Sequence, residues 1–149
     1  MDCDFSHNPD DLLRLTAELE AGADVAVGSR YSKGVTVVNW PMSRLLMSYC
    51  ASRYVRIVTG MPVCDATAGF VGYKREVLAA IDFDRIEMVG YGFQIEMKYT
   101  AWKMGFRIGE VPIIFADRTE GTSKMSGGIF GEAFFGVLAL PFRTIARKK

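Results

Sequence analysis

The chain has 149 residues, 50% of them hydrophobic and 23% charged. This composition is that of a single globular domain, or a large part of one, and excludes a disordered protein. Eighteen basic against seventeen acidic residues give a net charge of +1, so a general nucleic-acid-binding surface is also excluded.

The first half of the chain predicts two helices and a strand between them. Residues 10–21 have helical apolar spacing and end before Gly22, and residues 23–28 form a short strand rich in valine. Residues 32–39 read as a loop. A longer helix is expected over 40–59, with Pro41 in its first turn and Gly60 after its end.

The second half continues the alternation of strands and helices. We expect a strand over 64–73, helices over 74–81 and 90–104, and a strand over 106–115. Pro112 cannot donate to a sheet ladder, so the last strand should lie near an edge. A polar loop over 117–128 leads into an apolar helix over 129–145 that is broken at Pro141. The pattern is that of an α/β fold with three recognisable strands.

The N-terminal segment carries Asp2 and Asp4, two carboxylates one residue apart. Carboxylates of this kind hold hard cations such as Mg²⁺ or Mn²⁺ and leave coordination positions for phosphate oxygens. Such pairs also cap helices or lie in turns, so the motif alone leaves both interpretations open. The single histidine, His7, excludes a multi-histidine metal site. Three cysteines without paired spacing favour a reducing compartment.

Arginine and aspartate residues follow the predicted strands. Arg30 comes directly after the strand at 23–28, where its planar fork could bind phosphate or pair with a carboxylate. Asp65 precedes a Thr-Ala-Gly turn and could orient a substrate or an arginine. Gln94 and Glu96 stand two apart on a helix, so only one of them should face a site.

Two segments suggest contact with a membrane surface. On the helix at 40–59, an apolar stripe that includes Met42, Leu46 and Tyr49 is continued by Arg53 and Arg56, and Arg44 lies on the other side. This face could rest on lipid headgroups or belong to a core helix whose end emerges into solvent. The apolar segment at 129–149 ends in four cations, which fits an interfacial anchor or a helix packed on another part of the fold.

Six stretches in this order resemble family 2 glycosyltransferases, and within them the dolichol-phosphate and polyprenol-phosphate mannosyltransferases. The stretches are residues 1–9, 27–31, 39–44, 65–70, 90–97 and 117–125. The resemblance implies a GT-A domain with an α/β, Rossmann-like sheet, represented here by its acceptor-side half at residues 1–128. Family members begin about 80 to 100 residues earlier, with nucleotide-binding strands. Weak nucleotide-sugar binding and self-association through an open sheet edge are therefore expected of this chain alone.

The implied reaction moves mannose from GDP-mannose to a dolichyl or polyprenyl monophosphate, with inversion at the anomeric carbon. By resemblance, Mg²⁺ or Mn²⁺ is held by Asp2, Asp4 and Ser6, although a serine is a weaker ligand than the residue usual in the family. Asp4, Arg30 and Asp65 are expected in the catalytic site. The residues matched to substrate binding are Arg30, Arg44, Gln94, Arg118, Ser123 and Lys124.

The implied location is peripheral, on the cytoplasmic face of a membrane. Residues 129–149 would form the interfacial segment, and nucleic acid is not an expected partner. Two alternatives remain at this stage: a transferase that moves glucose or another hexose to undecaprenyl phosphate, and a non-catalytic α/β fragment.

Overall fold

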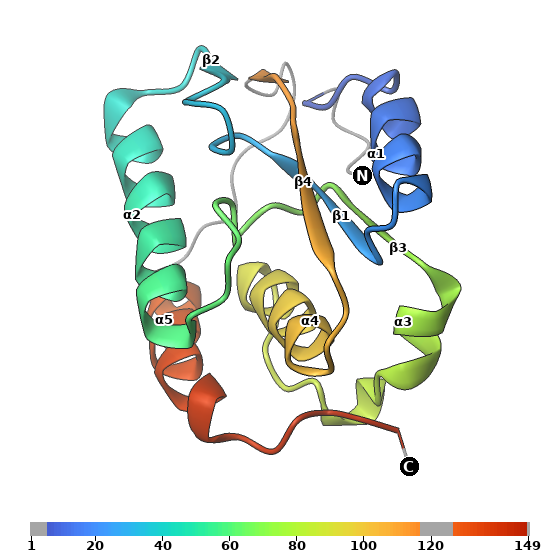
Figure 1. Cartoon of the computed structure of the whole chain (residues 1–149). Helices are drawn as coiled ribbons and strands as arrows, with labels where there is room; N and C mark the ends of the chain where they lie inside the picture. The colour runs from blue at the N-terminus through green and yellow to red at the C-terminus, as the bar shows by residue number, and fades with distance from the viewer. Residues whose placement is uncertain (1–5, 117–126, 149) are drawn as a thin grey trace.

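The computed structural model describes residues 6–116 and 127–148 (Figure 1). Its centre is β1 (Val25–Ser29), which is buried at every position. A three-stranded sheet has the order β3-β1-β4, with β3 (Val71–Tyr73) antiparallel to β1 and β4 (Ile108–Pro112) parallel to it. The sheet is therefore mixed, and β1 is covered on both edges and both faces.

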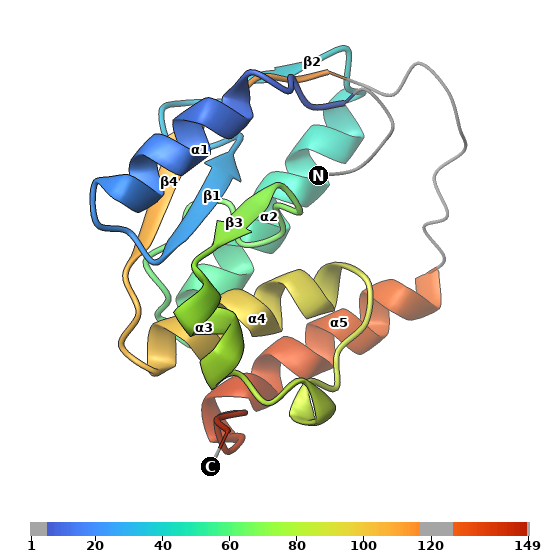
Figure 2. The ribbon, with the colours of Figure 1, turned by 90° about the vertical axis from the view of Figure 1, so that its right-hand side faces the viewer.

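Alternate residues of β1 enter two different hydrophobic clusters, as the two-residue period of a strand requires. Val25 and Val27 pack with Met97 and Ala101 of α4 (Tyr91–Lys103). Ala26 faces the other way and packs with Leu15 of α1 (Asp11–Glu20). Figure 2 shows the result: α1 covers one face of the sheet, while α4 and α5 (Gly127–Ala139) lie beyond the other.

A third cluster joins the long helices below the sheet. Val55 of α2 (Met42–Thr59) packs with Ile95 of α4 and with Val137 of α5. The Tyr54 ring stacks on Phe134 at 4.6 Å between centroids, and its hydroxyl donates to the Phe134 carbonyl oxygen. Helices α2 and α5 are thereby fixed side by side.

The remaining elements are short. They are β2 (Val37–Val38), α3 (Arg75–Ala80), the 3-10 helix η1 (Phe83–Arg85), β5 (Phe115–Ala116) and the 3-10 helix η2 (Leu140–Phe142). Parallel pairing joins β2 to β5 in a second, two-stranded sheet. Within 32–39, which was expected to be a loop, Val37 and Val38 are therefore strand.

Most sequence-based predictions of elements are confirmed, with corrections at their ends. The helix predicted over 40–59 ends at Thr59, and Gly60 closes it in a left-handed conformation with φ 71°. Only the end of the strand predicted over 64–73 is strand, because residues 64–70 are irregular around a turn at 66–67. The helix predicted over 129–145 ends at Ala139, just before Pro141. The predicted loop at 117–128 lies mostly outside the described residues.

Pro112 confirms the prediction of an edge position. It terminates β4, which is an outer strand of the sheet formed by the described residues. The observed α/β architecture, with its small mixed sheet, agrees with the expected partial GT-A domain.

Candidate functional site

A buried ion pair lies at the C-terminal end of β1. Arg30 directly follows the strand and donates three hydrogen bonds to Asp65: from its backbone N (2.9 Å), from Nε (2.7 Å) and from Nη2 (2.6 Å). Arg30 is 8% exposed and Asp65 is fully buried. Of the two possibilities open for Arg30, the pairing with a carboxylate is the one observed. Asp65 correspondingly orients an arginine.

The pair keeps Arg30 charged in a dry environment. Burial alone would lower the pKa of Arg30, but the hydrogen bonds and charge of Asp65 outweigh this, so the pKa is raised above its usual value. Nε donates to Asp65, and Nη2 donates both to Asp65 and to Thr67 Oγ1, the latter at 3.0 Å. Any contact from Arg30 to a phosphate would therefore have to come from Nη1.

Three aromatic rings surround the Arg30 guanidinium. Its Cζ lies 5.3 Å from the ring centroid of Tyr31, 5.4 Å from that of Trp40 and 5.7 Å from that of Phe115. Their π faces favour a cation. Arg44, in the first turn of α2, stacks on the same Trp40, with Cζ 4.1 Å from the ring centroid. Two of the four predicted cations are thus brought to one indole.

Gly28 of β1 allows Phe70 and Ile113 to approach the strand closely. A Cβ at this position would lie 2.9 Å from Cδ1 of Phe70 and 3.1 Å from Cδ1 of Ile113. The Gly28 N–H donates to the Phe70 carbonyl oxygen at 2.8 Å. A glycine here lets Phe70 pack directly on the backbone that leads to Arg30.

The N-terminal segment enters at the same end of the sheet. Ser6 is 2% exposed, and His7 forms an isolated antiparallel bridge with Phe115, one of the rings around Arg30. The His7 ring lies 5.0 Å from the Phe115 ring and 4.8 Å from the Phe70 ring, between centroids. These contacts agree with a packing role for His7. Asp2 and Asp4 lie outside the described residues.

Of the other predicted site residues, some lie within the part of the chain that the structure describes and some lie outside it. Arg118, Ser123 and Lys124 lie outside the described residues. Gln94 is half-buried on α4, and its role stays a prediction. Glu96 is structural, as expected for one member of that pair, because it accepts hydrogen bonds from the N–H groups of Glu87 (3.0 Å) and Met88 (2.8 Å). Residues 6–116 and 127–148 contain no cluster of three ligating side chains suited to a metal ion.

Three side chains at the site were not predicted from the sequence. Trp40 belongs to a recognised motif, but its role as a shared platform depends on where α2 begins. Glu110 accepts hydrogen bonds from the N–H groups of Cys64 (2.8 Å) and Asp65 (3.0 Å). Lys98, completely buried on α4, donates to the Ala68 carbonyl oxygen at 2.7 Å. A fully buried lysine on a helix gives no periodicity signal that would distinguish it from an exposed one.

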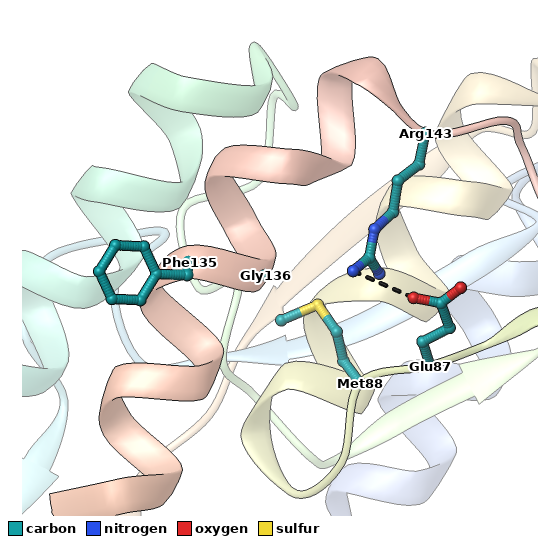
Figure 3. A pocket seen from close by; sticks show the side chains of 5 residues that line it. All are labelled: Glu87, Met88, Phe135, Gly136 and Arg143. Carbon is teal, nitrogen blue, oxygen red and sulfur yellow. Dashed lines mark ion pairs between the residues drawn. The ribbon is translucent and has the colours of Figure 1, made fainter.

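A pocket of about 320 Å³ lies against α5 and η2 (Figure 3). It is lined by Glu87, Met88, Phe135, Gly136 and Arg143, and Arg143 pairs with Glu87 at 3.1 Å. None of these residues is among the predicted site residues. We therefore place the candidate site at Arg30 and Asp65 and not in this pocket.

Comparisons with known proteins identify the family. The model of glycosyl transferase family 2 matches residues 1–82. The chain is 48% identical over 137 residues to polyprenol monophosphomannose synthase of Mycolicibacterium smegmatis, covering 92% of this chain and 52% of that protein. It is also 48% identical over 137 residues to undecaprenyl-phosphate mannosyltransferase of Micrococcus luteus, covering 92% of this chain and 56% of that protein.

A more distant relative comes from an archaeon. Dolichol-phosphate mannosyltransferase of Pyrococcus furiosus is 34% identical over 129 residues, which cover 85% of this chain and 35% of that protein. The chain spans about half the length of the two bacterial relatives. The six motifs, the mixed α/β sheet and these matches agree, and the chain belongs to glycosyl transferase family 2.

Proposed function

We propose that this chain carries the acceptor-side half of an enzyme that transfers mannose from GDP-mannose to a polyprenyl monophosphate. The names of its relatives support mannose as the sugar and a polyprenyl phosphate as the acceptor class. The observation that carries the proposal is the placement of Arg30 and Arg44 on one indole, beside the N-terminal segment and at the C-terminal end of β1. This end of an α/β sheet is where ligands gather.

The transfer reaction requires that the two substrates be positioned and that their negative charges be screened. A phosphate monoester is already an anionic nucleophile, so no general base is needed. One of its oxygens forms a bond to the anomeric carbon while the bond from that carbon to the diphosphate breaks. The diphosphate leaves with the electron pair. Arg30 and Arg44 would screen the negative charge of the two reactants, and Asp65 would hold Arg30 in place.

The donor set at the N-terminus fits a hard cation, because it consists of the carboxylates of Asp2 and Asp4 and the hydroxyl of Ser6. Ser6 lies at the same end of the sheet as Arg30. Bound there, Mg²⁺ or Mn²⁺ would neutralise charge on the leaving diphosphate. Arg118, Ser123, Lys124 and Gln94 complete the proposed substrate-binding set.

The first test uses the gene product at its natural full length. Asp2→Ala and Asp4→Ala are each expected to lower mannose transfer from GDP-mannose to polyprenyl phosphate on the order of 100-fold, because a charge-stabilising group is lost from the transition state. Turnover is measured as radiolabelled mannose extracted into organic solvent. Asp10→Ala is the matched control, since Asp10 is exposed and makes no side-chain cap hydrogen bond on α1. Turnover retained in both variants would refute the proposed metal site, and GDP-glucose in place of GDP-mannose tests the sugar.

We propose further that α2, α5 and η2 rest on the membrane surface, on its cytoplasmic face. Apolar side chains are exposed on all three, among them Leu46 (54%), Ile57 (77%), Phe135 (70%) and Phe142 (90%). In this structure Met42, Leu46 and Tyr49 of the predicted apolar stripe on α2 are exposed. The core face is the opposite one, with Ser52, Val55 and Thr59. Among the described residues no helix is long and apolar enough to cross a bilayer, and the proposed contact is peripheral.

Vesicle binding tests this contact. Ile57→Asp combined with Phe142→Asp is expected to weaken partitioning of the chain onto anionic phosphatidylglycerol vesicles by at least about tenfold, because two apolar side chains no longer enter the interface. The measurement is co-sedimentation over a lipid titration. Leu12→Asp combined with Leu13→Asp on α1 is the control, since it adds the same two negative charges at side chains that are exposed but lie on another helix. Equal losses in both proteins would mean that the effect is one of net charge and not of this surface.

A further inference from the structure

The turn at residues 64–68 is held from two sides by side chains that play no part in the proposed chemistry. Both carboxylate oxygens of Glu110, on β4, accept a backbone N–H, Oε2 from Cys64 at 2.8 Å and Oε1 from Asp65 at 3.0 Å. On the far side of the turn, Lys98 Nζ donates to the Ala68 carbonyl oxygen at 2.7 Å. The backbone on each side of Asp65 is therefore fixed by a separate element of the core.

Burying the Lys98 side chain costs free energy. It is 0% exposed, and an ammonium group that leaves water must find charges and acceptors to compensate. The charges that act on it come from the turn, from the end of β1 and from β4, through Asp65, Arg30 and Glu110 respectively. Two cations and two carboxylates, of which Glu110 is half-buried and the other three are buried, thus influence one another, and their charges cancel when Lys98 is protonated. Leucine or methionine would fill the same space without this cost, so packing alone does not explain the lysine.

The chain of contacts leads from Lys98 and Glu110 to Arg30. The turn positions Asp65. The Asp65 carboxylate accepts hydrogen bonds from Nε, Nη2 and the backbone N–H of Arg30. A tilt of the turn would rotate this carboxylate and carry the guanidinium with it. We propose that Lys98 and Glu110 are positioning residues for the transfer reaction, which set the orientation of Arg30 by clamping the turn around Asp65. The proposal rests on the function proposed above for its catalytic consequence, but its structural part does not.

Two nearly isosteric variants test the clamp. Lys98→Met removes the donor and the charge and keeps a similar shape. Glu110→Gln keeps one carbonyl oxygen, so one of the two N–H groups faces an amide N–H₂ in place of an acceptor. Lys103→Met on the same helix is the control, because Lys103 is exposed and its Nζ lies over the Trp102 ring at 5.0 Å.

The first readout is the Arg30 Nε–H resonance in ¹H–¹⁵N spectra of this chain. It is assigned as the resonance that is missing from the spectrum of Arg30→Lys. Since Nε–H is buried and bonded to Asp65, it should exchange slowly with solvent in the wild type. We expect the resonance to shift and to exchange at least about tenfold faster in Lys98→Met and Glu110→Gln, with circular dichroism unchanged, and to be unaffected in Lys103→Met. An unchanged Arg30 resonance in both variants would overturn the proposal, and Glu110→Gln keeps it testable where Lys98→Met fails to fold.

The second readout is mannose transfer by the gene product at its natural full length. Both variants should lower kcat per folded molecule on the order of tenfold or more, since a small misplacement of a positioned group has effects of that size. A residue with only a structural role would lower stability and leave kcat per folded molecule unchanged. If the wild-type enzyme transfers no mannose, the proposed function fails, while the Arg30 resonance still decides whether the clamp exists.

Discussion

Replacing Asp65 with asparagine is expected to destabilise the fold by about 3–5 kcal/mol, the usual cost of leaving one member of a buried ion pair without its partner. The asparagine side chain would keep the shape but would carry no charge and would turn an amide N–H₂ toward the Arg30 donors. Arg30 is 8% exposed, so water cannot replace the lost carboxylate. Urea denaturation followed by circular dichroism measures the change, which is a large part of the total stability of a small domain.

Asp24→Asn is the matched control for this substitution. Asp24 pairs with Lys74 at 3.5 Å and accepts the Arg107 backbone N–H at 2.9 Å, a bond that the asparagine carbonyl oxygen can keep; both side chains of the ion pair are partly exposed, so the same change should cost less than about 1 kcal/mol. The double variant Arg30→Met with Asp65→Asn should cost less than the sum of the two single changes, because it removes the buried charge that the asparagine leaves behind. A loss below about 1 kcal/mol in Asp65→Asn would show that Arg30 is compensated by other groups.

Raising the pH from 7 to 8.5 is expected to stabilise the folded chain by about 1.5 kcal/mol through Lys98 alone. Burial lowers the pKa of Lys98 from 10.5 to about 7, against the opposing influence of Asp65 and Glu110, and Arg30 adds to the lowering. Between these two values the unfolded chain binds more protons than the folded chain, so stability rises with pH. The contribution is complete above the unfolded pKa and is lost as the pH falls through the folded pKa.

The window must stop near pH 8.5 because other groups act with the opposite sign above it. Burial raises the pKa of Cys64 and of Tyr73, so the folded state loses stability as the pH rises through the unfolded pKa values of these groups. Urea midpoints at half-unit steps of pH measure the slope. In Lys98→Met the slope should fall below about 0.3 kcal/mol per pH unit, because the titrating group is gone. A slope that survives this substitution would assign the pH dependence to another residue.

The local elements could be read from the sequence because their signals are local. Leu15 lies on a helix with apolar spacing, Gly60 provides a helix stop, and the valines of β1 indicate a buried strand. The strand predicted for the segment 64–70 was wrong, because its structure depends on distant residues. Its apolar residues resemble a strand, but three of its backbone groups bond to distant side chains: the N–H groups of Cys64 and Asp65 to Glu110, which lies 45 residues beyond Asp65, and the Ala68 carbonyl to Lys98, 30 residues further on.

The residues of the candidate site could be predicted from the sequence, but not the contacts between them. Arg30, Arg44 and Asp65 were predicted as site residues from the family motifs at 27–31, 39–44 and 65–70. The sequence did not show that the fork of Arg30 would be used on Asp65, nor that Trp40 would carry both guanidinium groups. The directions of side chains depend on how three separate elements meet.

By itself the sequence determined the fold class, the family and the order of helices and strands, because composition, periodicity and motifs are properties of neighbouring residues. The tertiary structure alone decided which charges face one another: the pairing of Arg30 with Asp65, the outward turn of the apolar stripe on α2, and the burial of Lys98. The energy of a charge depends on its solvent exposure and on partners that the chain brings together from distant positions. No window of neighbouring residues contains that information.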